Sequence, residues 1–177
     1  MLTLGIDPGT ATMGYGLVEE NGSGLKEICF GAIKTSSKQE MPLRLHKLHT
    51  ELLAIISKHK PDCVAVEKLF FGRNAKTAMS VGQARGIVIL AAAESGVPIA
   101  EYTPLQVKIA ATGYGKADKG QVQQMVKTLL KMESIPKPDD AADALAVAIC
   151  HLHSRTPFVP RLRSGHLPLA KGERKRG

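Results

Sequence analysis

The sequence predicts an α/β protein with five strands, of which the first three are antiparallel, and with helices flanking the sheet. Two observations support this prediction. The first 35 residues alternate apolar and polar side chains and contain a strong hairpin turn, which is typical of consecutive antiparallel strands. Beyond them, amphipathic helix patterns are separated by short apolar runs that have the length of strands.

The first expected strand, residues 2–7, carries a carboxylate to its end. Apolar side chains occupy every second position of the run LTLGID, and the pair Pro8-Gly9 then breaks the strand after Asp7. Mixed α/β proteins place their functional sites at the carboxyl ends of strands. Taken alone, the position fits a turn-capping Asp equally well.

The second expected strand, residues 14–18, contains two glycines, Gly14 and Gly16. Because glycine has no side chain, the strand is thin at these positions opposite Asp7. The third strand covers residues 27–35, and the Asn-Gly-Ser-Gly sequence at residues 21–24 forms the hairpin turn between them. The glycines fit two interpretations equally: room for a phosphate backbone near Asp7, or a tight packing site within the fold.

An amphipathic helix is expected over residues 42–58, and a second strand that ends in a carboxylate follows it. On the helix, His46 and His49 have a spacing that could hold a metal, but solvent-facing positions are favoured because no third ligand lies nearby in sequence. The strand, residues 63–67, is an apolar run that ends at Glu67. A glutamate at the end of a buried strand is costly unless it has a partner or a function.

Two adjacent aromatic residues, Phe70 and Phe71, follow Glu67 in a loop, and the whole chain has only four phenylalanines. We expect one of the two to cover the edge of the core and the other to stack on or separate nucleic-acid bases.

A long helix over residues 75–94 carries Gly82 and Gly86 one turn apart, with Ala78 in line with them. This smooth face lets another helix approach closely, either within the fold or in a homodimer. A short fifth strand at residues 98–102 follows, and then a helix that begins with Thr103 as its cap and Pro104 in its first turn.

Basic residues gather around the next two helices. Lys108 lies on the helix that begins at Pro104, and Lys119 lies in a glycine-rich basic loop just before a helix over residues 121–131. Lysines that flank a helix start are good partners for phosphate because the free backbone N–H groups point the same way. For any single lysine, a solvated loop position is the commoner case.

The last expected helix, residues 139–149, supplies two more carboxylates. Asp140 and Asp143 are spaced i, i+3 and therefore project from one face of an alanine-rich, otherwise apolar helix. Asp139 is explained by the preference for acidic residues at the positive end of a helix, but Asp143 is not.

Length and composition fit one soluble domain with a tail, at 177 residues and 44% apolar side chains. No apolar run reaches the roughly 18 residues of a membrane span and no signal peptide is recognisable, so we expect a cytoplasmic protein without membrane contact. The three cysteines form no C-x-x-C pair, which favours reduced, buried thiols over disulfides or a zinc site.

The net charge of +8 is concentrated at the C-terminus. Residues 155–177 hold seven Lys or Arg and one Glu, a net of +6, whereas residues 1–154 hold 17 basic and 15 acidic side chains, a net of +2. A nucleic-acid surface on the folded part must therefore arise from the clustering of basic residues.

The four carboxylates at strand ends and on the last helix predict a metal-dependent site. Grouped together, they repel one another unless divalent cations lie among them. Hard oxygen ligands without an accompanying His or Cys set favour Mg²⁺ or Mn²⁺ over zinc. Two such ions about 3.5–4 Å apart activate a water and stabilise the leaving oxygen in phosphodiester hydrolysis.

With these motifs the sequence resembles the RuvC family of Holliday-junction resolvases. The resemblance covers residues 1 to about 155 and rests on D-P-G-T-x-x-x-G-Y-G, on Glu67 before an aromatic loop, on G-Q-A-R-G at residues 82–86 and on D-A-A-D-A-L-A at residues 140–146. It implies a ribonuclease-H-like fold with a five-stranded mixed sheet. It also implies a homodimer that resolves four-way DNA junctions by paired symmetric nicks in recombination and repair, with a RuvA/RuvB-type branch-migration complex as partner.

The resemblance also implies roles for single positions. The acids that match the family's catalytic, metal-binding residues, with two Mg²⁺ ions per subunit or Mn²⁺ in their place, are Asp7, Glu67, Asp140 and Asp143. The positions that match DNA-contacting residues are Phe70, Lys108 and Lys119. The helix around Gly82 and Gly86 matches the dimer interface.

Two parts of the chain depart from the family pattern. Asp139 adds a carboxylate beside Asp140, and its contribution to the metal site stays open; Asp140 is preferred because it is the i, i+3 partner of Asp143. Residues 156–177 match poorly and are expected to form a basic, disordered tail that binds DNA strands or aids solubility.

Three other functions are compatible with parts of the sequence. A nucleotide-handling protein of the actin and hexokinase type also begins D-x-G-T, but such folds need two domains and a much longer chain. A ribonuclease-H-like nuclease that acts on RNA or on non-junction DNA is the second alternative. A structure-specific binder without catalysis is the third, and the intact set of carboxylates disfavours it.

Overall fold

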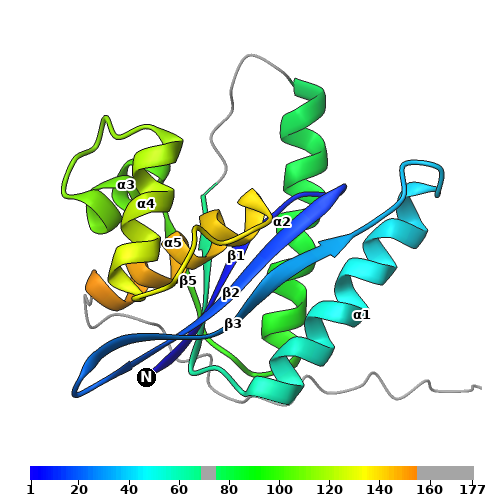
Figure 1. The fold of residues 1–177 in the computed structure, drawn as a ribbon. Helices are drawn as coiled ribbons and strands as arrows, with labels where there is room; N and C mark the ends of the chain where they lie inside the picture. The colour runs from blue at the N-terminus through cyan, green and yellow to red at the C-terminus, as the bar shows by residue number, and fades with distance from the viewer. Residues whose placement is uncertain (69–74, 155–177) are drawn as a thin grey trace, which may run out of the picture.

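The computed structural model describes residues 1–68 and 75–154. Its strands form one five-stranded sheet in the order β3-β2-β1-β4-β5 (Figure 1). The first three are antiparallel neighbours, whereas β4 pairs in parallel with β1 and β5 in parallel with β4. Their bounds are β1 Leu2–Asp7, β2 Thr12–Asn21, β3 Gly24–Lys34, β4 Cys63–Glu67 and β5 Ile99–Tyr102. The predicted α/β class, with five strands of which the first three are antiparallel, is confirmed.

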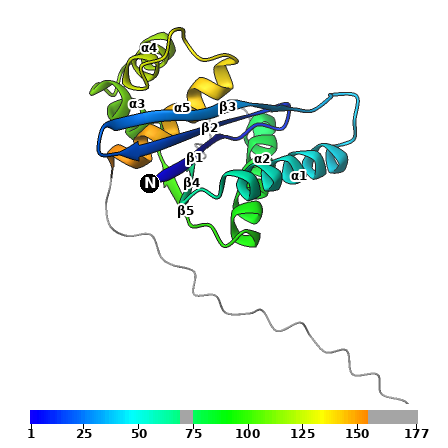
Figure 2. The same cartoon turned by 60° about the horizontal axis from the view of Figure 1, so that its bottom comes forward.

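Helices cover both faces of the sheet. α3, α4 and α5 lie on one face and α1 and α2 on the other, as the two views together show (Figures 1 and 2). Their bounds are α1 Met41–His59, α2 Ala75–Glu94, α3 Pro104–Thr112, α4 Lys119–Leu129 and α5 Asp139–His153. In the described part of the chain, no helix is long and apolar enough to cross a membrane.

The β2–β3 hairpin closes through the turn that the sequence predicts. Asn21 pairs with Gly24, so Gly22 and Ser23 form a two-residue turn, and the Asn21 side chain accepts a bond from the Ser23 backbone N–H at 3.0 Å. Gly24 has φ +118°, which a residue with a side chain rarely adopts. Because the pairing continues up to this turn, both strands are longer than predicted.

α5 is the central helix of the fold, and glycines on β1 and β2 let it lie close to the sheet. A Cβ on Gly5 would lie 2.7 Å from the Ala148 nitrogen, and one on Gly16 would lie 2.6 Å from the Leu145 side chain. A Cβ on Gly14 would overlap the main-chain oxygen of Asp140. Of the two interpretations of Gly14 and Gly16, the structure therefore supports tight packing and not space for a phosphate backbone.

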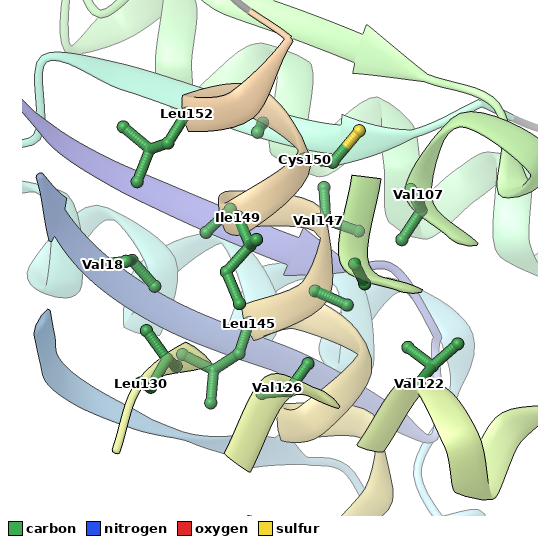
Figure 3. Close-up of a cluster of buried hydrophobic side chains, with 14 of the residues drawn as sticks. Val18, Val107, Val122, Val126, Leu130, Leu145, Val147, Ile149, Cys150 and Leu152 are labelled. Atoms are coloured by element: carbon green, nitrogen blue, oxygen red, sulfur yellow. The ribbon is translucent and has the colours of Figure 1, made fainter. Parts of the chain in front are cut away.

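The core on this face joins α5 to both smaller helices. In Figure 3, Leu145 and Ile149 of α5 point toward Val18 of β2, toward Val126 of α4 and toward Leu130, which directly follows α4. All of these side chains are buried and belong to one cluster. This packing fixes the position of α4, and with it the lysine at its N-terminus, relative to α5.

The opposite face packs through the apolar side of α1. Leu48, Leu52 and Ile56 are buried, as the predicted periodicity requires. His49 lies at the rim of this layer, with its Nε2 2.8 Å from a Glu94 carboxylate oxygen, so it joins α1 to α2. This contact gives His49 a structural role.

Capping residues set the starts of α3 and α4. The side chains of Thr103 and Asp118 each accept a bond from the backbone N–H of the Gln three residues later, and the backbone N–H of each cap donates to the side-chain oxygen of that Gln. Because Asp118 is the cap, α4 begins at Lys119, two residues earlier than predicted. Lys119 is therefore the first residue of the helix and not part of the preceding loop.

Candidate active site

Strand register brings two of the predicted acids together. β1 and β4 are parallel with Ile6 opposite Val66, so the next residues, Asp7 and Glu67, end neighbouring strands at the same edge of the sheet. Asp143, on the second turn of α5, joins them in lining a cleft of about 240 Å³. Three of the four predicted carboxylates thus face one space.

The walls of this cleft combine charge with apolar surface. Lys108 of α3 and Lys119 of α4 line it together with the three acids. Val107 and Val122 from the same two helices form part of the apolar wall. Low-polarity walls strengthen the interactions among the charged groups because they keep water away from part of each carboxylate.

Asp7 is the most strongly perturbed acid in the cleft. Burial, followed by the negative charges of Asp143, Glu67 and Asp140, raises the pKa of Asp7 from 3.8 to about 7. Lys119 opposes this rise. Burial and the charge of Asp143 also raise the pKa of Glu67, and Lys108 partly offsets that rise. Burial, together with the neighbouring negative charges, thus holds the pKa of two carboxyl groups above the ordinary value.

Asp140 lies next to Asp7 but toward the sheet. Gly14 pairs with Asp7 across the β1–β2 ladder, and the main chain of Asp140 packs directly on Gly14. Asp140 is not among the described residues that line the cleft, although its charge contributes to the raised pKa of Asp7. Of the i, i+3 pair on α5, only Asp143 lines the cleft, whereas Asp140 lies beside it.

Asp139 is directed to a different partner. Its Oδ1 accepts a bond from the Lys137 ammonium at 2.7 Å, and this contact lowers the pKa of Asp139. The Lys119 ammonium lies 3.9 Å from the other carboxylate oxygen. Lys137 thus neutralises Asp139 outside the cleft, and the preference for Asp140 over Asp139 as the partner of Asp143 stays a prediction.

The chemistry of the cleft fits a hard divalent cation. Its donors are carboxylate oxygens, and Mg²⁺ and Mn²⁺ prefer such ligands. Burial and neighbouring negative charge raise the pKa values of Asp7 and Glu67, and a cation in the cleft would favour their ionised forms. Within residues 1–68 and 75–154, no three His, Cys, Asp or Glu side chains lie close enough together to form a metal-ligand cluster as they stand.

Comparison with known proteins identifies the family of the chain. The family described as crossover junction endodeoxyribonuclease RuvC matches residues 3–151. The chain belongs to the RuvC family. Its ribonuclease-H-like fold, with a five-stranded mixed sheet, is thereby confirmed along with the resemblance.

Bacterial members of the RuvC family are similar over most of the chain. The crossover junction endodeoxyribonuclease RuvC of Syntrophomonas wolfei is 56% identical over 154 residues, which cover 87% of this chain and 90% of that protein. The same enzyme of Desulfitobacterium hafniense is 60% identical over 154 residues, which cover 87% of this chain and 93% of that protein.

Solved structures of the RuvC family share the fold. The Thermus thermophilus RuvC structure is 38% identical, with a TM-score of 0.81, and the match covers 86% of this chain and 94% of that chain. T. thermophilus RuvC in complex with a Holliday junction substrate is 36% identical, with a TM-score of 0.79 and the same coverage. The yeast mitochondrial Holliday junction resolvase Ydc2, at 15% identity and a TM-score of 0.62, shares the fold over 85% of this chain and 77% of its own.

The remaining predicted positions of the RuvC pattern lie away from the cleft or outside the described residues. Gly86 on α2 is exposed, and a Cβ there would have no atom within 4 Å beyond its chain neighbours and the backbone of its own helix. Gly82, one turn earlier, is half-buried. Phe70 falls outside the described residues, as do the residues of the predicted basic tail, so their predicted roles stay predictions.

The sequence analysis did not predict a chain of hydrogen bonds that holds the turn after Asp7. Arg44 of α1 donates from Nε to the Thr35 hydroxyl at 2.9 Å, and this hydroxyl donates to the Thr10 carbonyl at 2.6 Å. These bonds tie the turn after Asp7 to the end of β3. Their three residues come from separate segments, so no local periodicity or motif could reveal them.

Proposed function

We propose that this protein is a structure-specific endodeoxyribonuclease that resolves four-way DNA junctions by hydrolysing phosphodiester bonds in two opposing strands. The observation that carries the proposal is the cleft itself, where acids from β1, β4 and α5 face lysines from α3 and α4. Membership of the RuvC family and similarity to T. thermophilus RuvC, solved with a Holliday junction substrate, support this substrate.

The proposed cofactor is Mg²⁺, with two ions per subunit and Mn²⁺ as a substitute. The residues proposed to hold the ions, and so to form the catalytic centre, are Asp7, Glu67, Asp140 and Asp143. Bound divalent ions supply Lewis acidity, which activates a water and stabilises the leaving oxygen of a phosphodiester. The raised pKa of Asp7 supports the assignment, because a nearby cation would favour the ionised carboxylate that metal binding requires.

The proposed role of the lysines is to bind phosphate. Lys108 and Lys119 carry positive charge into a cleft rich in carboxylates, where a DNA backbone would otherwise be repelled. The apolar wall formed by Val107 and Val122 limits access of bulk water to the bound phosphate. Phe70 is proposed to contact the junction near the crossover.

We also propose that the protein acts as a homodimer through α2. Paired symmetric nicks need two cleavage sites, and one protomer offers a single cleft of this kind among its described residues. The outer face of α2 carries the exposed Gly86 and two exposed apolar side chains, Met79 at 70% and Leu90 at 48% of their full accessibility. An exposed apolar surface of this sort is typical of association sites.

Further proposals concern the tail and the setting. Residues 1–155 are proposed to form the nuclease domain and residues 156–177 a basic tail that binds DNA strands. A RuvA/RuvB-type branch-migration complex is the proposed partner, as the family resemblance implies. Because the proposed substrate is recombining DNA, the proposed location is the cytoplasm.

Replacement of Asp7 tests the catalytic assignment. Asp7→Asn should bind a synthetic four-way junction with the affinity of the wild type but fail to cut it in Mg²⁺, because it loses a metal-binding carboxylate and keeps the shape of the side chain. Asp139→Asn is the matched control and should still cut, since Lys137 holds that carboxylate outside the cleft. Wild-type cutting rates in Asp7→Asn would remove Asp7 from the site.

A further inference from the structure

Lys119 holds a position within the acidic cleft that a bound cation would be expected to take. Its Nζ lies 2.9 Å from Oδ2 of Asp143 and 3.9 Å from a carboxylate oxygen of Asp139. Its charge also opposes the raised pKa of Asp7. One ammonium therefore interacts electrostatically with three carboxylates, of which Asp7 belongs to β1 and Asp139 and Asp143 belong to α5.

The structure positions this ammonium through the start of α4. Asp118 caps the helix with reciprocal bonds to Gln121, so the backbone of Lys119 is fixed at the first helical residue. Val122 and Val126 then anchor α4 in the core beside α5. These contacts hold the backbone in place, while the side chain is 55% exposed and has a flexible four-carbon stem. The head group can leave Asp143 without moving the helix.

The ammonium and a divalent ion compete for the same oxygen. Mg²⁺ binds carboxylate oxygens directly, at about 2.0–2.1 Å, so an ion held by Asp143 would take the carboxylate that Lys119 contacts. In the structure, the Lys119 ammonium lies 2.9 Å from Oδ2 of that carboxylate. Two cations beside one carboxylate would also repel each other.

We propose that Lys119 is a place-holding cation: it neutralises Asp143 in the metal-free protein and is displaced toward the open side of the cleft when a divalent ion binds. The displaced ammonium is then free for a DNA phosphate, so metal loading precedes tight phosphate binding. This inference rests on the proposed metal-binding function of the cleft. It adds a role for Lys119 that ordinary phosphate contact does not include.

Mn²⁺ binding to the full chain without DNA tests the competition. We compare the wild type with Lys119→Met, which keeps the length of the stem, and with Lys137→Met, which removes a nearby charge that pairs with Asp139. Removal of a partly exposed ion pair that competes with the metal should tighten Mn²⁺ binding about fivefold in Lys119→Met. Lys137→Met should change it by less than about twofold, since a surface charge outside the cleft is well screened. Unchanged or weaker binding in Lys119→Met would overturn the proposal.

Chemical labelling provides a second readout in the wild type and needs no variant to fold. Reductive methylation of lysines, followed by mass spectrometry, reports whether an amine is held by a carboxylate. Mn²⁺ should increase the methylation of Lys119 relative to Lys116, an exposed lysine of the preceding loop that serves as internal reference. If Mn²⁺ binds but the labelling of Lys119 does not rise, the place-holding role is wrong while the metal site stands. If Mn²⁺ binds neither the wild type nor Lys119→Met, the metal assignment fails, and this inference fails with it.

Discussion

Asp7→Asn should stabilise the metal-free protein at alkaline pH, even though it should abolish cleavage. Asp7 is buried among like charges, and its pKa of about 7 in the folded protein compares with 3.8 for the free group. The unfolded chain therefore loses this proton near pH 4, whereas the folded chain keeps it until near pH 7. Between these values unfolding releases a proton, so the stability contributed by this site falls as pH rises and stays low above pH 7.

The size of the effect follows from the pKa difference. A shift of about 3 units corresponds to about 4 kcal/mol at 1.36 kcal/mol per unit, which is the upper limit of the gain. Asn remains a partly buried polar group with its own desolvation cost, so we expect a net gain of about 1–2 kcal/mol. For a chain of this size, that raises the melting temperature by roughly 2–8 °C.

Thermal melts in a chelator at pH 8 and pH 4 measure this gain. Asp7→Asn should melt above the wild type at pH 8, and the difference should shrink at pH 4, where Asp7 is neutral in the folded protein. Asp139→Asn is the control and should give no gain at pH 8, because Lys137 lowers the pKa of Asp139 and so favours its ionised form. If Asp7→Asn melts at or below the wild type at pH 8, the electrostatic reasoning about the cleft is refuted.

Two further predictions concern association and the tail. Gly86→Glu should convert a dimer to a monomer in sedimentation while the protomer stays folded by circular dichroism, since a side chain at this position has open space in the protomer. An intact dimer would exclude α2 at Gly86 as the interface. A chain that ends at residue 155 should keep its melting temperature but show a weaker salt dependence of junction binding, by about 0.9 in log–log slope for each lost phosphate contact. An unchanged slope would show that the tail does not bind DNA.

Local patterns in the sequence predict those parts of the fold that depend on neighbouring residues. The strand that ends at Asp7 and the one that ends at Glu67 are both correct at the carboxyl end, because alternation or an apolar run followed by a break is a local signal. The start of α4 is wrong by two residues, since the capping role of Asp118 outweighs the appearance of a glycine-rich loop.

Features of the site that depend on packing between helices could not be predicted. The contact between Lys119 and Asp143 exists because α4 lies against α5, and no spacing in the sequence encodes the angle between two helices. The same holds for Gly14, whose two interpretations are separated only when the main chain of Asp140 is found packed on it. The i, i+3 spacing predicts that Asp140 and Asp143 share one face of α5. Only the packing of α5 on the sheet shows that Asp143 lines the cleft and that Asp140 lies against Gly14.

The acids at the edge of the sheet are proposed to cut four-way junctions with the help of divalent ions. The most direct test is cleavage of three substrates with the same arm sequences: a synthetic four-way junction, a linear duplex and an RNA–DNA hybrid, each with and without Mg²⁺. We predict paired nicks in opposing strands of the junction, in Mg²⁺ only, and little cutting of the other two. Equal cutting of junction and duplex, preference for the hybrid, or cleavage that persists in a chelator would contradict the account.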